Sequence, residues 1–410
     1  MEKEDIHIHT LSNGIRLVHL NERSDVAYLG FVVGTGTRDE NDSEQGMAHL
    51  VEHMLFKGTA HRKAWHILNR LDSVGGELNA YTTKEETYVY ATVLKNDFER
   101  AVELMSDILF HSTFPESELE KEVEVVLDEI NSYEDSPSEL IYDDMENLLF
   151  ENQPIGRNIL GSKKSLLKHD SAALHRFVDE NYRNSEIVFY SIGDVRFEKI
   201  VRWAEKYMLS HFRTEAKSRK PTEGNCRLQE KRMKKRTHQC HYMAGSRAYS
   251  LHQERERLTL YLLNNILGGP GMNSCLNVSL RERNGLAYTI ESNMVSYSDT
   301  GLWSVYFGCD KQNEQRCKDL MNKELRRVCE TPFTMQQLQK MKRQIFGQMA
   351  IAAENKENLI QSIGKSILYF DRYAGMKETV ELLESISADD IQRVAKEIIM
   401  PERLTTLVYG

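Results

Sequence analysis

The sequence has few prolines and no long apolar stretch. Only seven of its 410 residues are proline, and 40% are apolar, a composition typical of a globular protein without a sizeable disordered segment. A membrane-spanning helix needs roughly 18 consecutive apolar residues, and a secretion signal needs an apolar run of roughly 7–15 residues. The first residues are charged instead, Met-Glu-Lys-Glu-Asp-Ile-His-Ile-His. We therefore expect a cytoplasmic protein that does not contact the membrane.

Cysteine pairs and concentrated positive charge are also missing. The six cysteines all lie in the second half of the chain, and none forms a Cys-x-x-Cys pair. This spacing indicates neither a disulfide framework nor a cysteine zinc cluster. The net charge is −9 and the one basic run, Lys231–Arg236, is short. Because binding to phosphates needs a concentrated basic surface, we expect no nucleic-acid partner.

The length and the order of patterns predict two domains. A chain of 410 residues is too long for one ordinary core and suits two domains of about 200 residues. Residues 6–34 alternate around Ser12-Asn13-Gly14, which predicts a β-hairpin, and helical and strand patterns then mix, which predicts an α+β fold. Residues 213–236 are polar and basic, as in a connecting segment. We expect domains at 1–212 and 237–410, whose element orders loosely repeat.

What the chain does contain is the segment His49-Leu-Val-Glu52-His53. Apolar residues at helical spacing surround it, and Asp42 with Gln45 suggests a capping pair before it. On a helix His49, Glu52 and His53 lie on one side, opposite the apolar face. A catalytic zinc takes three protein ligands and keeps a fourth position for water. Two histidines leave one ligand to find, and a solvated helix face is the alternative.

A second helical segment offers that ligand. Residues 116–133 have an apolar stripe, and Glu122 and Glu129 lie seven apart along one edge of it. Both carboxylates would border the buried face of the helix. Either could complete the metal site, and spacing alone does not choose between them.

These motifs resemble the pitrilysin and mitochondrial processing peptidase family of zinc peptidases, in its half-length bacterial form. The matching segments cover nearly the whole chain: residues 49–59, 75–82, 86–88, 125–130, 267–272 and 280–288. The resemblance implies two similar α+β domains, each a mostly antiparallel sheet packed with helices. It implies that His49, His53 and Glu129 ligate one Zn²⁺ per chain and that Glu52 is the general base. Glu122 would support the site from outside the ligand set.

The resemblance also implies how substrate is held. Asn79 and Ala80 would lie on an edge strand that receives a peptide as an added strand. Arg281 and Tyr288 would contact the substrate backbone and steady the oxyanion, acting on the zinc site of the partner in a homodimer that encloses a chamber. The segment Gly268–Gly271 resembles a glycine-rich loop beside that chamber, with a plain turn as the alternative.

The function we expect is a zinc endopeptidase that cleaves peptides or small unfolded polypeptides. Because metal binding needs deprotonated histidines, its activity should fall below about pH 6. The alternative is a scaffold or peptide-binding subunit of the same fold without catalysis, or a subunit that needs a different partner.

Overall fold

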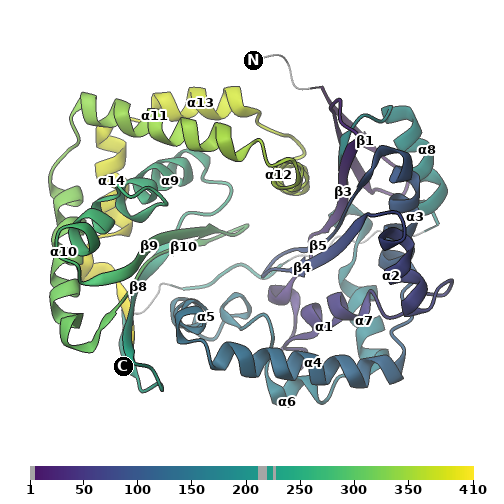
Figure 1. Ribbon diagram of the computed structural model, residues 1–410, viewed down its shortest axis with the longest axis horizontal. Coiled ribbons are helices and arrows are strands. Elements are labelled where there is room, and N and C mark those ends of the chain that lie inside the picture. Colours follow the sequence, from purple (N-terminus) through teal and green to yellow (C-terminus); the bar gives the residue numbers. More distant parts are fainter. Residues whose placement is uncertain (1–4, 211–218, 225–227) are drawn as a thin grey trace. The chain divides into compact units, whose positions relative to one another are not determined.

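The computed structural model describes residues 5–210, 219–224 and 228–410, and its chain divides into two compact units (Figure 1). The first unit comprises Met1–Ile130, Arg157–Lys220 and Ile351–Gly375, and the second comprises Asn131–Gly156, Pro221–Ala350 and Met376–Gly410. This division differs from the two continuous domains that we expected, because each half of the chain lends one segment to the other unit. The expected connecting segment also contains a strand, β7 (Glu230–Met233), while its residues 213–218 and 225–227 lie outside the described residues.

The first unit is built on a six-stranded sheet with the order β1-β2-β6-β3-β5-β4. Its strands are β1 (Ile6–Thr10), β2 (Arg16–Asn21), β3 (Val26–Val33), β4 (Glu77–Thr82), β5 (Thr87–Leu94) and β6 (Ile187–Gly193). Only β2 and β6 pair in parallel. The predicted hairpin is confirmed, since β1 and β2 pair antiparallel around Gly14, whose φ of 94° a glycine adopts without strain.

Alternating side chains give this sheet two covered faces. On one face Leu17, Phe31 and Phe189 join the core with the helices, which are α1 (Met47–Met54), α2 (Ala64–Asp72), α3 (Phe98–Phe110), α4 (Glu116–Glu134), α6 (Lys163–Leu166), α7 (Ser171–Asn181) and α8 (Phe197–Met208). On the other face lies α12 (Lys356–Phe370), which comes from the distant segment 351–375 (Figure 1). A Cβ on Gly364 would come within 2.6 Å of the ring of Tyr190, so α12 packs directly on the sheet.

The second unit has a five-stranded sheet with the order β7-β11-β8-β10-β9. Its further strands are β8 (Gln239–Ala248), β9 (Ala287–Ser296), β10 (Gly301–Asp310) and β11 (Thr405–Tyr409). Its helices are α5 (Pro137–Leu149), α9 (Glu254–Gly268), α10 (Glu314–Glu330), α11 (Met335–Ala352), α13 (Met376–Ser385) and α14 (Ala388–Ile398). The face opposite α9, α10 and α14 is covered by α5, which comes from segment 131–156.

The two sheets share one topology. In the first unit β2 pairs in parallel with the last strand, β6, and the antiparallel series β6-β3-β5-β4 follows. In the second unit β7 pairs in parallel with the last strand, β11, and the antiparallel series β11-β8-β10-β9 follows. The expected α+β fold of two similar, mostly antiparallel domains is therefore confirmed. No helix in the described ranges combines the length and apolarity that crossing a membrane requires.

Candidate functional site

The helix α1 presents the His-x-x-Glu-His motif from a buried position. Its apolar residues Met47, Leu50, Val51 and Met54 are fully buried, which fixes the direction of the polar face. The helix begins after Gly46, whose φ is 87°, and its first backbone N–H groups are satisfied by one carboxylate: Glu40 accepts from Gly46 N at 3.1 Å and from Ala48 N at 2.9 Å. This side chain does the work of an N-cap from six residues upstream.

The expected capping pair of Asp42 and Gln45 is wrong. The helix starts later than the pattern suggested, and the side chain of Gln45 donates only to the backbone oxygen of Asp42, at 3.4 Å. Sequence reasoning missed Glu40, because a cap supplied by a preceding turn leaves no periodic signal.

Three side chains from α1 and α4 converge in the first unit. The Nε2 atoms of His49 and His53 each lie 3.8 Å from Oε2 of Glu129, and one ligand atom from each residue lies within 4.8 Å of the other two. Tetrahedral zinc ligands at about 2.1 Å from the metal lie about 3.4 Å apart. Two imidazoles and one carboxylate at these separations fit a catalytic zinc, which keeps its fourth position for water. The geometry also selects Glu129 over Glu122 as the carboxylate that meets both histidines.

Glu122 lies behind one of the ligands. Its Oε2 is 3.1 Å from Nδ1 of His53, and its Oε1 is 2.6 Å from Nζ of Lys57. A carboxylate at Nδ1 accepts a hydrogen bond from the N–H of that nitrogen, which fixes the proton there and leaves the Nε2 lone pair for a metal. Burial, and next the neighbouring His53, lowers the pKa of His49 to about 3. Its ring is therefore neutral at ordinary pH, as metal binding requires.

Glu52 is not one of the three converging groups, although its carboxylate interacts electrostatically with His53 and Glu129. It is buried, and its Oε2 accepts a hydrogen bond of 2.7 Å from the hydroxyl of Thr82 at the end of β4. Burial raises the pKa of Glu52, while the hydrogen bond from Thr82 opposes the shift. A carboxylate with a raised pKa is suited to accept a proton near neutral pH.

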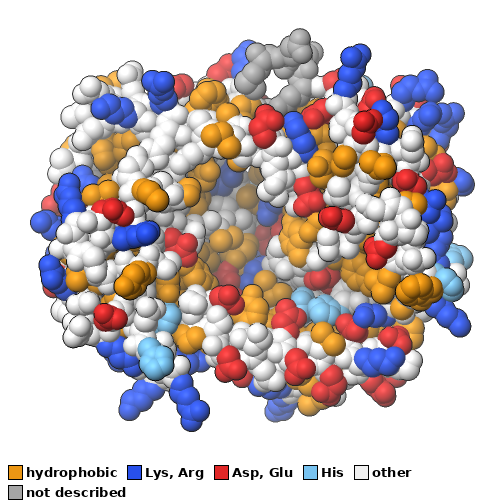
Figure 2. Space-filling view, in the orientation of Figure 1, with side chains coloured by type: hydrophobic (Ala, Val, Ile, Leu, Met, Phe, Trp, Pro, Cys, Tyr) orange, Lys and Arg blue, Asp and Glu red, His pale blue; other side chains and the backbone are white. Residues whose placement is uncertain are grey.

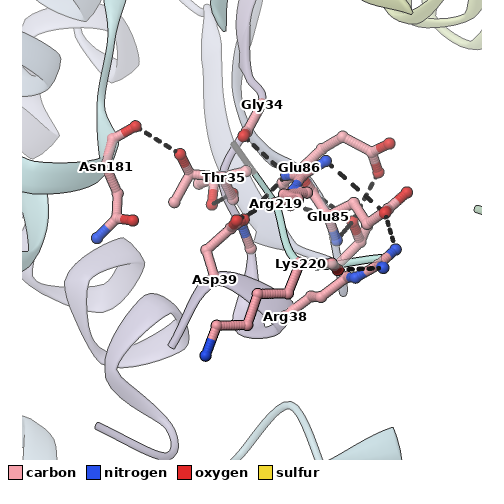
Figure 3. A network of polar contacts seen from close by, with 12 residues as sticks. Gly34, Thr35, Arg38, Asp39, Glu85, Glu86, Asn181, Arg219 and Lys220 are labelled. Atoms are coloured by element: carbon pink, nitrogen blue, oxygen red, sulfur yellow. Dashed lines mark hydrogen bonds and ion pairs between the residues drawn. The ribbon is translucent and has the colours of Figure 1, made fainter. Parts of the chain in front are cut away.

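A network of buried charges holds the turn between β4 and β5 against the segment that precedes α1 (Figure 3). Nη1 of Arg38 lies 2.7 Å from Oε1 of Glu85, and both side chains are almost fully buried. Arg219 pairs with Asp39 at 2.9 Å and donates to the backbone oxygens of Gly34 and Glu85 at 2.8 and 2.6 Å. Charges at this depth persist only when they are paired. The network thus fixes the turn that follows Thr82 and the segment that leads towards α1.

The strand that was expected to receive substrate is at a sheet edge. Among the described residues β4 pairs only with β5, through pairs such as Asn79 with Tyr90 and Ala80 with Val89. The side chain of Asn79 is exposed, whereas Ala80 packs partly against the core. The other edge of β4 is therefore open to backbone pairing within this unit.

The remaining predicted residues lie in the second unit. Arg281 belongs to a π-helix, Asn277–Glu282, and its side chain is half exposed, 3.8 Å from Glu282. Tyr288 is 81% exposed on β9, which is an edge strand of its sheet. The expected loop Gly268–Gly271 begins at the last residue of α9, and a Cβ on Gly268 would come within 2.7 Å of the backbone nitrogen of Ser292. Close packing of α9 against β9 is thus one reason for glycine there.

The second unit contains a helix in the place that α1 has in the first unit, but this helix lacks the metal-binding histidines. The helix α9 packs on β9 as α1 packs on β4, yet α9 contains no histidine. Within the described ranges, every group of three residues that could hold a metal lies in the first unit. The duplication thus leaves the candidate metal site to the first copy.

This fold and this site together define the class of inverted-motif zinc peptidase folds, and comparison with known proteins agrees. Residues 16–163 match the family described as Insulinase (Peptidase family M16), and residues 170–345 match the one described as Peptidase M16 inactive domain. The chain belongs to peptidase family M16. The family that the sequence motifs resembled is thereby confirmed.

Relatives and solved structures match along the whole chain. An uncharacterized zinc protease of Bacillus subtilis, YmxG, is 30% identical over 402 residues, which cover 98% of this chain and 97% of the relative. An uncharacterized zinc protease from Rickettsia felis is 31% identical over 400 residues, which cover 97% of this chain and 95% of the relative. A protease structure from Helicobacter pylori superposes with a TM-score of 0.91 at 20% identity and full coverage of both chains. A structure from Pseudomonas fluorescens titled peptidase M16 inactive domain superposes with a TM-score of 0.91 at 16% identity. It covers 99% of this chain and 98% of that chain.

Proposed function

We propose that this chain is a zinc endopeptidase with one catalytic Zn²⁺, held by His49, His53 and Glu129. The observation that carries the proposal is the convergence of these three donors, at 3.8 Å between each histidine nitrogen and the carboxylate oxygen. The relatives are named as zinc proteases, which supports the same metal and activity. Bound there, zinc would polarise the scissile carbonyl and lower the pKa of an attacking water.

Glu52 acts as the general base. It takes the proton of the attacking water and passes it to the leaving amine, so it must be ionised before the reaction and close to the open metal position. Its burial and the hydrogen bond that it accepts from Thr82 support this role. Glu122 acts through another residue, because its contact with Nδ1 of His53 orients that ring.

The substrate binds as an extended strand along β4. Backbone hydrogen bonds at the open edge would hold peptides of varied sequence, since the pairing uses no side chains. The hydrogen bond from Thr82 to Glu52 links the end of this strand to the general base. An exposed Asn79 beside that edge is available to contact substrate side chains.

The functional unit is a homodimer in which Arg281 and Tyr288 serve the zinc site of the partner. The exposure of both side chains supports this, because an aromatic ring that is 81% exposed in one chain is available to contact a second molecule. Arg281 would hold the developing oxyanion, and Tyr288 would contact the substrate backbone.

Hydrolysis of a defined peptide library tests the proposal. We expect chelated protein to cut nothing, and about one equivalent of Zn²⁺ per chain to restore cleavage of internal bonds in peptides of varied sequence. Zinc-loaded protein that binds these peptides but cuts none would instead establish the alternative, a peptide-binding subunit without catalysis.

A further inference from the structure

A second group of metal-binding side chains lies in the first unit, outside the site described above. It consists of His61, Asp107 and His111, and one ligand atom of each lies within 4.8 Å of the other two. Nδ1 of His61 is 2.6 Å from Oδ1 of Asp107, and Nδ1 of His111 is 3.4 Å from the same oxygen. The two imidazole rings are 5.0 Å apart at an angle of 76°. Both rings therefore approach one carboxylate oxygen from different sides.

The carboxylate is held so that Oδ1, which makes a hydrogen bond of 2.6 Å with Nδ1 of His61, faces both imidazoles. Asp107 is 5% exposed, and its other oxygen, Oδ2, accepts from the hydroxyl of Thr59 at 2.8 Å and from Nη1 of Arg62 at 2.6 Å. These two donors fix the rotation of the carboxylate and leave Oδ1 directed at the imidazoles. The arrangement resembles a ligand with its supporting partners already in place.

One imidazole of the group has an unsatisfied nitrogen. Nδ1 of His111 is buried and has no hydrogen-bond partner among the described residues, because its contact with Asp107 lacks hydrogen-bond geometry. A buried polar nitrogen without a partner is unfavourable, because it has lost its hydrogen bond to water. A metal ion at the centre of the group would remove that cost. His61 is 60% exposed in its side chain, so the group is open to solvent from that side.

We propose that His61, Asp107 and His111 bind a second divalent transition-metal ion, of which Zn²⁺ is the expected occupant. Two imidazoles and one carboxylate suit zinc and its first-row neighbours and do not suit Mg²⁺, which prefers oxygen ligands. The fourth position would be filled by water on the side of His61. The positive charge of Arg62 on the same carboxylate makes this site weaker than the one at His49 and His53.

The ion would hold the connection between α1 and α2 against the end of α3. His61 lies in the connection between α1 and α2, whereas Asp107 and His111 lie at the end of α3. The same connection carries Lys57, which contacts Glu122 on α4. Histidine side chains are visible at the surface on the right of the space-filling view (Figure 2), and the exposed side chain of His61 leaves an ion a route from solvent. Occupancy would thus stabilise the first unit next to the catalytic helix, independently of the proposed peptidase activity.

Titration of the chelated full-length chain with Co²⁺, whose visible spectrum reports imidazole and carboxylate coordination, tests this site. We expect wild type to bind about two ions per chain and His61→Ala/His111→Ala about one. The matched control is His66→Ala, an exposed histidine on α2, which should still bind two. His49→Ala/His53→Ala should keep the second ion only, which separates this proposal from that of the catalytic zinc.

Thermal unfolding gives a second readout that does not need activity. Zn²⁺ added beyond the first equivalent should raise the Tm of wild type and of His66→Ala, but not that of the single variant His61→Ala, whose exposed position makes it safe for folding. Equal stoichiometry and an equal Tm response in wild type and His61→Ala would overturn the proposal. That result would leave the cluster as a hydrogen-bonded contact between the connection and α3.

Discussion

Oε2 of Glu122 lies 3.1 Å from Nδ1 of His53, on the opposite side of the ring from Glu129, which is 3.8 Å from Nε2. The two glutamates that sequence spacing could not separate therefore contact different nitrogens of one imidazole. One is placed to share the metal with that ring, and the other to orient it.

This difference predicts unequal effects of two matched substitutions. Glu129→Gln should abolish zinc retention, because a neutral amide replaces the charged ligand, whereas Glu122→Gln should lower zinc affinity only about 10–100-fold. Competition with a chromogenic chelator measures both affinities. If Glu122→Gln released zinc and Glu129→Gln retained it, the two assignments would be reversed.

The hydrogen bond from Thr82 to Glu52 predicts a shift in pH dependence. Burial raises the pKa of Glu52 and the Thr82 hydroxyl lowers it, so Thr82→Val should raise it further. Because the base works only when ionised, activity is lost as pH falls through this pKa. The acid limb of kcat/KM should therefore move to higher pH by about 1 unit.

Thr82→Ser is the matched control, since it keeps the hydroxyl. Its acid limb of kcat/KM should lie at the same pH as that of wild type. The same limb in all three proteins would exclude Glu52 as its origin. The decline expected in wild type below about pH 6 is also better attributed to Glu52 than to His49, whose pKa burial lowers to about 3.

The capping carboxylate predicts a link between stability and metal binding. Glu40→Ala leaves the N–H groups of Gly46 and Ala48 without their acceptor, and should cost about 1–3 kcal/mol of unfolding free energy. Zinc affinity should fall too, because α1 carries two of the three ligands. Glu40→Gln keeps one amide oxygen as acceptor and should lose less. Urea unfolding of the zinc-loaded proteins measures the free energy of unfolding, which should be highest for wild type and lowest for Glu40→Ala. Equal stability of Glu40→Ala and wild type would contradict the role of Glu40.

The proposed dimer predicts complementation between inactive chains. Arg281→Ala should lose about 10²–10³-fold in kcat if Arg281 holds the oxyanion, and Glu52→Gln should be inactive for a different reason. After random exchange, half of the dimers contain one chain of each kind and one intact composite site, so activity should return to about a quarter of wild type. If labelled subunits demonstrate exchange and activity still does not recover, action across the dimer is excluded.

Local patterns were sufficient for much of the fold and for the face of α1. The hairpin at Gly14 and the polar face of His49, Glu52 and His53 follow from periodicity, which depends only on neighbours in sequence. The alternation of strands and helices likewise predicted the α+β class. The choice of Glu129 needed three-dimensional contact, because its partners lie about 80 residues earlier and two carboxylates shared the same edge of α4.

Contacts between distant segments were not predictable in this way. The packing of α12 on the sheet, which places Ile360 and Ile363 in one hydrophobic cluster with Tyr190, joins residues far apart in the chain. The buried pair of Arg38 and Glu85 looks in sequence like two surface charges. Such charges are normally exposed, so only the structure reveals that these two are buried and paired.

The most direct test of the central claim is zinc content and peptide cleavage of Glu52→Gln beside wild type. The substitution keeps the size of the side chain and the hydrogen bond from Thr82, and Glu52 is not among the three converging donors. The account predicts that the variant retains about one catalytic zinc per chain and cleaves a quenched peptide about 10²–10⁴-fold more slowly. A variant that holds zinc and cleaves at the wild-type rate would contradict it.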